Sequence, residues 1–254
     1  MSETMRIVQL YPELLGVTGD RGNVAVFETR LRAAGLDVET VRVGVGEPLP
    51  EGGIDVLVLG NGPLSAMRRV APDLHAKRDA IEALFAAGSL VFAVGAGAEL
   101  LSRGTTTLEG EHLAGLGLFP FAVTRSRERR VGYIVAESEH GQIVGFEDHA
   151  ATWQLDAGAV ALATVTAGGG SIGTPGPGAG ESIRVGEAYA TNVQGPALPL
   201  NPAWADAMLT AALARRGMEY SRTREHERLD ALARGARDKI IALARVTQIT
   251  AIGL

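Results

Sequence analysis

Residues 92–101, Phe-Ala-Val-Gly-Ala-Gly-Ala-Glu-Leu-Leu, combine an apolar strand pattern with small residues that lead directly into a helical pattern. A tight strand-to-helix turn of this kind lifts one side chain above a sheet and aims the next backbone N–H groups at the same point. A nucleophile on the turn would therefore meet oxyanion-stabilising donors, which is the arrangement that acyl transfer requires. Position 95 is the place for this nucleophile, and it holds Gly95, which has no side chain to attack with.

The chain offers few replacements for the missing nucleophile. It has no cysteine, which excludes disulfides, thiolate metal sites and a cysteine nucleophile. Four of its five histidines stand singly, without acidic residues at a spacing typical of metal ligands. We therefore expect no metal and no cofactor, and we expect these histidines to have surface or core roles.

The elements that position the turn follow from the hydrophobic pattern of the N-terminal part. Apolar runs predict strands at residues 5–10, 38–43, 54–59 and 90–94, and three-and-four spacing predicts helices at 23–34 and 72–87. The order β-α-β-β-α-β, with short glycine-containing loops, predicts an α/β fold with a doubly wound, mostly parallel sheet and helices on both faces. Ligands bind such sheets beyond the carboxyl ends of the strands, which here are the loops at 60–63 and 95–99.

The C-terminal part has a different pattern. Short alternating segments at residues 131–136, 143–146, 160–166 and 183–189 predict extra strands that are antiparallel or at a sheet edge. Helices are expected at 201–214 and, from an apolar stripe, at 229–244. We expect residues 1–215 to form one domain and residues 216–254 a helical extension packed on it. Docking to a partner is the alternative use of that extension.

Composition and charge limit the class of protein. With 254 residues, 46% of them hydrophobic, the chain can bury the core of one mid-sized domain. It has no uncharged apolar run of about 18 residues and no signal-peptide pattern at its start, so we expect a soluble cytoplasmic protein. Residues 215–245 carry nine Arg or Lys against five Asp or Glu, hence +4 there and −9 elsewhere for a net charge of −5. The negative net charge excludes a globally basic nucleic-acid-binding surface. For the basic segment 215–245 two interpretations remain: the solvated face of a helix, which we favour, or a docking surface for an anionic partner.

Several dispersed motifs occur together in a fixed order. They are Leu10-Tyr11-Pro12, Gly19-Asp20-Arg21-Gly22-Asn23, Leu59-Gly60-Asn61-Gly62, the turn at 92–101, Gly115-Leu116-Gly117-Leu118, Gly145-Phe146-Glu147-Asp148-His149 and Gly195-Pro196-Ala197-Leu198-Pro199-Leu200-Asn201-Pro202. Through them the chain resembles the class I glutamine amidotransferases of the cobyric acid synthase (CobB/CobQ) type, and within that family the GatD-type glutaminase subunits. The resemblance covers about residues 6–215 and implies a flavodoxin-like domain.

Members of this family hydrolyse glutamine with a Cys–His pair and pass ammonia to a synthetase partner. Their turn reads Cys-Gly-Gly-x-Gln, so the resemblance places their cysteine on Gly95. Their Leu-His-Gly-Pro segment places the histidine on Gln194. Glycine has no attacking atom, and a carboxamide takes up no proton near neutral pH. We therefore expect both catalytic positions to be vestigial and glutaminase chemistry to be lost.

A set of polar groups around the turn remains as candidate ligand-binding residues. They are Gly60, Asn61, Gly62, Ala96, Gly97, Glu99, Arg130 (or Arg129) and His149. The 60–63 loop and the N–H groups of Ala96 and Gly97 predict a place for an anion or a polar carbonyl. Glu99 adds a carboxylate, and the arginine lies in a stretch that resembles the family's arginine-containing segment, where it would hold a ligand carboxylate. The alternatives are a solvated charge run at 125–130 and, for His149, a hydrogen-bonded loop histidine, which we favour.

Three functions are compatible with this sequence. The first, which we favour, is a pseudo-glutaminase, a scaffold for a partner such as a Mur-ligase-like (MurT-type) synthetase that amidates a cell-wall precursor. The second is an enzyme of altered chemistry in cobalamin synthesis or peptidoglycan amidation. The third is a sensor for a small amino-acid-like ligand. An exposed apolar patch would favour a docked partner, and titratable groups with shifted pKa values around position 95 would favour new catalysis.

Overall fold

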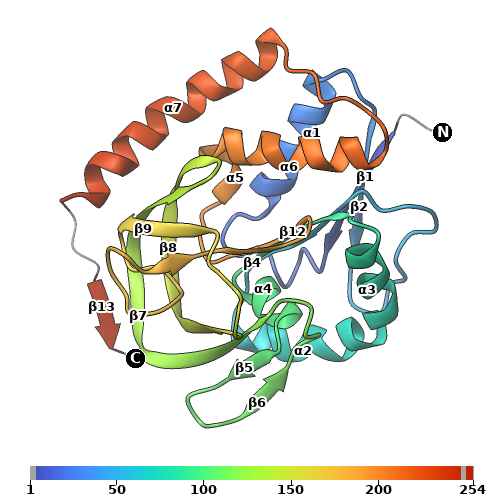
Figure 1. Ribbon diagram of the computed structural model, residues 1–254. Coiled ribbons are helices and arrows are strands. Elements are labelled where there is room, and N and C mark those ends of the chain that lie inside the picture. Colours follow the sequence, from blue (N-terminus) through green and yellow to red (C-terminus); the bar gives the residue numbers. More distant parts are fainter. Residues whose placement is uncertain (1–3, 247–249, 254) are drawn as a thin grey trace.

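The computed structural model describes residues 4–246 and 250–253, which form two sheets with flanking helices (Figure 1). The first elements are β1 (Met5–Leu10), α1 (Arg21–Ala33), β2 (Val38–Val43), β3 (Val56–Leu59), α2 (Leu64–Ala76), α3 (Arg78–Ala86), β4 (Leu90–Val94) and α4 (Ala96–Leu101). They are followed by β5 (Gly104–Thr106), β6 (His112–Ala114), β7 (Phe121–Ser138), β8 (Gly141–Leu155), β9 (Ala163–Ala167), β10 (Gly180–Glu181), β11 (Ile183–Val185) and β12 (Ala188–Thr191). The last are α5 (Ala197–Leu200), α6 (Pro202–Arg215), α7 (Arg224–Ala244) and β13 (Thr250–Gly253). Among the described residues no helix is long and apolar enough to cross a membrane.

The main sheet has the strand order β11-β12-β4-β3-β1-β2 and is parallel except for the edge strand β11. Its central strands are buried on both faces, which explains their continuous apolar sequences. The predicted doubly wound, mostly parallel sheet is therefore confirmed. The prediction for residues 183–189 was right in part, because β11 is an antiparallel edge strand, but the segment is not a single strand. The chain turns at Gly186, and β12 then pairs in parallel with β4, so that Thr191 lies opposite Val94.

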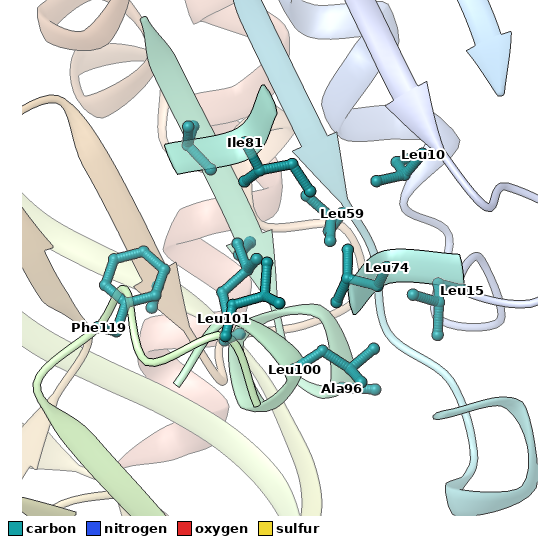
Figure 2. Packing of buried hydrophobic residues seen from close by; sticks show 14 of the residues in the cluster. Leu10, Leu15, Leu59, Leu74, Ile81, Ala96, Leu100, Leu101 and Phe119 are labelled. Carbon is teal, nitrogen blue, oxygen red and sulfur yellow. The ribbon is translucent and has the colours of Figure 1, made fainter. Parts of the chain in front are cut away.

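Two apolar cores cover the faces of this sheet, because successive strand residues point to opposite sides. On one side Phe92 packs edge-to-face against Phe27 of α1 and Trp204 of α6. On the other side Leu59 belongs to a cluster with residues of α2, α3 and α4, and Figure 2 shows it among labelled residues of these helices. The sheet is thus packed on both faces, and this packing fixes the positions of the strand ends from which the loops at its carboxyl edge begin.

The helix predicted at residues 72–87 is in fact two helices. Helix α2 begins earlier, after the extended Pro63, and contains Pro72 in its interior. Proline removes one helical hydrogen bond and clashes with the preceding turn. The helix ends at Lys77, whose backbone leaves the helical region (φ −95°, ψ 5°), before α3 begins.

The second sheet has the order β10-β9-β7-β5-β6, with β8 and β13 also paired to β7. Strands β7 and β8 form a long antiparallel hairpin that extends well beyond the predicted segments 131–136 and 143–146. Its register shifts at a bulge between Arg125 and Arg130, and such a bulge re-aims the side chains that follow it.

Candidate functional site

The predicted turn is present at the carboxyl end of β4. Gly95 follows β4 directly and starts α4 with φ 51° and ψ −114°, a left-handed conformation that favours glycine. Its N–H donates to the carbonyl of Thr191 on β12 at 2.8 Å, and its own carbonyl accepts from the N–H of Glu99 at 2.9 Å. These bonds hold position 95 at the carboxyl edge of the sheet, where a nucleophile would project.

The side chain of Asn61 occupies the space above this turn. A Cβ atom built on Gly95 would lie 2.3 Å from Oδ1 and 2.6 Å from Cγ of Asn61, far inside contact distance. Asn61 Oδ1 is held in this place because it accepts the N–H of Ala96 at 2.9 Å. Position 95 therefore has no reactive atom, and any side chain placed there would have to displace the carboxamide of Asn61.

The backbone donors expected at the turn are already used inside the protein. The N–H of Ala96 donates to Asn61, and the N–H of Gly97 donates to the carbonyl of Gly60 at 3.1 Å. This corrects the expectation that the two N–H groups are open to an anion or a carbonyl. The carboxamide of Asn61 stands where an oxyanion or ligand oxygen would have to bind.

The glycines of the 60–63 loop allow close packing against the loop that follows β1. A Cβ atom on Gly60 would lie 2.2 Å from the carbonyl oxygen of Leu15, and one on Gly62 would lie 2.5 Å from that of Leu14. Gly97 has a similar role, since its Cβ atom would lie 2.7 Å from the carbonyl oxygen of Leu59. In this structure the three positions serve backbone packing. The proposed contact of Gly60 and Gly62 with a ligand remains a prediction.

Glu99 does not point into an open pocket. Its side chain is 2% exposed, and Oε2 accepts from Thr105 Oγ1 at 2.9 Å and from Arg125 Nη2 at 2.8 Å. The arginine that reaches the turn helix is thus Arg125 rather than Arg129 or Arg130. Sequence reasoning missed it because the bulge after Arg125 changes which residues of the run face inward.

The remaining residues of the 125–130 run are divided between surface and interior. Arg129 is half-exposed and pairs with Asp148 at 2.5 Å. Arg130 is buried, and its Nη2 donates to the carbonyl of Ala151 at 2.6 Å. Burial lowers the pKa of Arg130. The run is therefore not simply a solvated face.

His149 lies opposite Arg130 in the β7/β8 hairpin, so it is a strand residue and not the predicted loop residue. Its side chain is buried, Nδ1 lies 3.1 Å from the carbonyl of Ala151, and Nε2 lies 3.8 Å from Glu147 Oε2. Glu147 in turn accepts the N–H groups of Gly169 and Gly170 at 2.6 and 3.0 Å. His149 is thus a hydrogen-bonded strand residue whose Nε2 has no hydrogen-bond partner among the described residues, and its proposed contact with a ligand remains a prediction.

Gln194, which the sequence resemblance predicts at the position of the family's histidine, lies in the loop after β12 and therefore at the same sheet edge as Gly95. It is buried, and its N–H donates to the carbonyl of Phe146 at 2.7 Å. Its side-chain Nε2 donates to the carbonyl of Asp148 at 3.3 Å, whereas Oε1 has no hydrogen-bond partner among the described residues. The structure thus brings Gly95 and Gln194 to one edge of the sheet, and neither position carries an acid or a base.

Asp20 is a site residue that the sequence analysis treated only as part of a turn motif. It is 1% exposed, and Oδ2 accepts the N–H of Asn61 at 3.0 Å and Thr18 Oγ1 at 3.1 Å. Burial raises the pKa of Asp20 to about 6, and these hydrogen bonds oppose the shift. The chain of contacts from Asp20 to Asn61 to Ala96 joins the loops after β1, β3 and β4, so Asp20 positions the residue that fills the turn.

The buried Asp20 predicts a pH-dependent stability. Because its folded pKa of about 6 exceeds the value of about 4 in an unfolded chain, the folded state binds the proton more tightly between these values. The free energy of unfolding therefore falls as pH rises through that window. Asp20→Asn removes this component and should be more stable than the parent at pH 7 by about 2–3 kcal/mol, with little difference near pH 4.

Urea unfolding at both pH values measures this difference. The exposed Asp37 offers a matched control, since Asp37→Asn removes a carboxylate from solvent and should change stability little at either pH. An Asp20→Asn variant with the same stability difference at both pH values would contradict the prediction.

Comparison with known proteins agrees with this geometry. Residues 19–200 match the model of the CobB/CobQ-like glutamine amidotransferase domain. The chain is 26% identical over 217 residues to the GatD subunit of the glutamine-hydrolyzing lipid II isoglutaminyl synthase of Staphylococcus aureus strain N315, covering 85% of this chain and 87% of that protein. It is 25% identical over 215 residues to the corresponding subunit of Streptococcus pneumoniae strain ATCC BAA-255 / R6, covering 84% and 82%.

Solved structures show the same fold at low identity. A glutamine amidotransferase from Thermotoga maritima superposes with a TM-score of 0.52 at 13% identity, covering 95% of each chain. A second glutamine amidotransferase gives a TM-score of 0.53 at 18% identity, covering 81% of this chain and 98% of the other. Since the family model spans well over half of the sequence, the chain belongs to the CobB/CobQ-like glutamine amidotransferase family.

Proposed function

We propose that this chain is a pseudo-glutaminase, an amidotransferase-fold subunit that supports a synthetase partner without hydrolysing glutamine. The observation that carries this proposal is the replacement of the nucleophile by Gly95 together with the carboxamide of Asn61, 2.3 Å from where a Cβ atom would stand. Hydrolysis needs a thiolate or alkoxide that attacks the amide and a base that manages its proton. Neither group is present at positions 95 and 194.

Neighbouring hydroxyls and acids do not replace the lost pair. Ser102 Oγ donates to the carbonyl of Glu99 at 2.7 Å, and Thr105 Oγ1 donates to the Glu99 carboxylate at 2.9 Å. Asp20 has a shifted pKa beside the turn, but its carboxylate is buried and already accepts from Asn61 and Thr18. These contacts support a scaffold over an enzyme of altered chemistry.

The relatives suggest the kind of partner. The Staphylococcus and Streptococcus proteins are subunits of a lipid II isoglutaminyl synthase. By analogy we propose that this chain assembles with a Mur-ligase-like synthetase that amidates a cell-wall precursor. Such a synthetase would have to obtain ammonia from solution or from another subunit.

The nitrogen source of the reconstituted synthetase tests this proposal. The purified chain is mixed with the Mur-ligase-like synthetase of the same cell, ATP and lipid II, with either ammonium or glutamine as the nitrogen donor. Amidated product is expected with ammonium and not with glutamine, because the chain cannot release ammonia from the amide. The synthetase alone with ammonium is the control, and the chain should raise its rate or stability.

The two parts of the proposal fail differently in this experiment. Product formed from glutamine at a rate close to that with ammonium would overturn the loss of glutaminase activity. Absence of any complex and of any effect on the synthetase would overturn the choice of partner and leave the loss of glutaminase activity in place.

A further inference from the structure

A pocket lies at the carboxyl edge of the main sheet, beyond strands β1 and β2. Its volume is about 430 Å³, which is within the range of small-molecule sites. It is lined by residues 11–14, which follow β1, by Arg42 of β2, by Gly44, Val45 and Glu47, which follow β2, and by Arg69 of α2. None of residues 95–99 lines it. The carboxyl edge is the side of an open parallel sheet on which ligands bind.

The walls of this pocket are held together by Asp73 of α2. Its Oδ2 accepts from the hydroxyl of Tyr11 at 2.7 Å, and its Oδ1 accepts from the N–H of Gly46 at 3.0 Å. Tyr11 has a positive φ of 56°, which is uncommon for a residue with a side chain, and its N–H donates to the carbonyl of Val43 at 2.7 Å. The loops after β1 and β2 are therefore fastened to α2 and to each other, so the pocket is preformed.

The charged side chains that line the pocket differ in their partners. Glu13 pairs at 3.2 Å with Arg21 of α1, and Glu47 accepts at 2.6 Å a backbone N–H within its own loop. Arg42 and Arg69, in contrast, have no hydrogen-bond or ion-pair partner among the residues that the structure describes. The pocket thus has two guanidinium groups that can bind an anion, whereas both of its carboxylates already have partners.

Two guanidinium groups in one pocket favour a doubly charged anion. A guanidinium presents parallel N–H donors that match the oxygens of a phosphate, and a phosphate ester carries a charge of about −1.5 to −2 at pH 7. A carboxylate carries a single charge, which one arginine can balance. The apolar side chains that line the pocket, Pro12, Leu14 and Val45, would contact an apolar group attached to the phosphate. Val45 is 48% exposed, and such a contact would remove apolar surface from water.

We propose that this pocket binds a small phosphate ester, with Arg42 and Arg69 holding the phosphate and with Leu14 and Val45 contacting its apolar part. Arg42 lies on a strand and Arg69 on a helix, so their backbones are fixed and only the side chains have to adjust to the ligand. This inference goes beyond the proposed function, because it uses neither the turn at Gly95 nor a partner subunit.

A nuclear magnetic resonance titration of the full chain tests the proposal, because the shifts of backbone amides report both the affinity and the place of binding. The probe is phenyl phosphate. Benzoate has the same ring with a single charge, and inorganic phosphate has the charge without the ring. We expect saturable shifts at residues 13–14 and 42–47 with phenyl phosphate. Benzoate and inorganic phosphate should each bind more weakly by about tenfold or more.

Arginine variants test whether the two named side chains hold the phosphate. Arg42→Gln and Arg69→Gln should each weaken the binding of phenyl phosphate by about tenfold, because each removes one charged hydrogen-bond donor. Both side chains are exposed, so the variants should keep the fold. Arg68→Gln is the matched control, since Arg68 precedes Arg69 on α2 but pairs with Glu111 and does not line the pocket. It should bind phenyl phosphate as the parent does.

Each part of the inference can be overturned by one of these measurements. Absence of saturable shifts at these residues with millimolar phenyl phosphate would remove the site. Benzoate bound as tightly as phenyl phosphate would overturn the choice of a doubly charged anion, and inorganic phosphate bound as tightly would overturn the choice of an ester. Equal affinities of the Arg42, Arg69 and Arg68 variants would remove the role of the two arginines. None of these measurements involves glutamine or a synthetase, so their outcome is independent of the proposed function.

Discussion

The purified chain is expected to release no ammonia from glutamine, with a rate lower by a factor of about 10⁶ than that of a subunit with an intact nucleophile and base. Gly95 and Gln194 supply neither an attacking atom nor a proton acceptor. The Asn61 carboxamide also occupies the Ala96 N–H, which is a donor that a tetrahedral intermediate would need. Ammonia release from glutamine, measured against a catalytically intact relative, checks this expectation.

Rebuilding the site in steps shows which of these losses matters. Gly95→Cys with Gln194→His should stay inactive, because the new Cβ atom would lie 2.3 Å from Asn61 Oδ1, which the Ala96 N–H holds in place, and the positive φ adds strain of about 1–3 kcal/mol. Adding Asn61→Gly removes the obstruction and frees the Ala96 N–H. Only this triple variant should form a covalent adduct with a glutamine-like electrophile, seen as a single mass increase.

Two controls make the series informative. Asn61→Gly alone should remain inactive, since it adds no nucleophile, and circular dichroism should show that each variant keeps its fold. Adduct formation by the double variant at the rate of the triple variant would show that Asn61 does not obstruct the turn. Glutamine turnover by the parent chain would refute the pseudo-glutaminase proposal itself.

Replacing Arg30 is expected to cause the largest loss of stability. Its guanidinium is 3% exposed and binds Asp206 through two parallel bonds of 2.6 and 2.7 Å, and Asp230 of α7 at 2.9 Å. In Arg30→Met the carboxylate of Asp206 stays buried without its main partner. Breaking one side of such a pair costs about 3–5 kcal/mol. Urea unfolding followed by circular dichroism measures the loss.

Arg222 provides a matched control for this prediction. It pairs with the same two carboxylates, Asp206 and Asp230, but its side chain is 45% exposed. Because solvent screens exposed pairs, Arg222→Met should cost less than about 1 kcal/mol. Equal losses in the two variants would contradict the argument from burial.

The same experiment examines our proposal that residues 216–254 belong to the domain formed by residues 1–215. Arg30 links α1, α6 and α7 through Asp206 and Asp230, so the parent chain should unfold in one cooperative transition. A separate early transition of the α7 helix signal in the parent would show that the extension is an independent unit.

The sequence by itself determined the parallel core and the absence of a side chain at position 95. Strands that are buried on both faces appear in the sequence as continuous apolar runs, and the small residues around Gly95 predict a sharp turn into a helix. Both features can therefore be predicted from the local sequence pattern. The absence of cysteine is a property of composition and needs no structure. The prediction that Gly95 and Gln194 stand at the family's catalytic positions came from the motifs that carry the family resemblance.

Only the tertiary structure decided what fills the turn and which charges reach it. Asn61 meets Ala96 across 35 residues of sequence, and Asp20 meets Asn61 across 41. The pairing of Glu99 with Arg125 depends on a bulge in a strand of the other sheet. Local periodicity predicts which side chains are buried, but it does not predict which loops distant in sequence come into contact. At the turn, close packing of these loops determines which side chain fills the space above Gly95. The apolar stripe of α7 was visible in the sequence, whereas only the structure decided which of its residues are covered: Ala233 and Ala244 are buried, and Leu232 is 65% exposed.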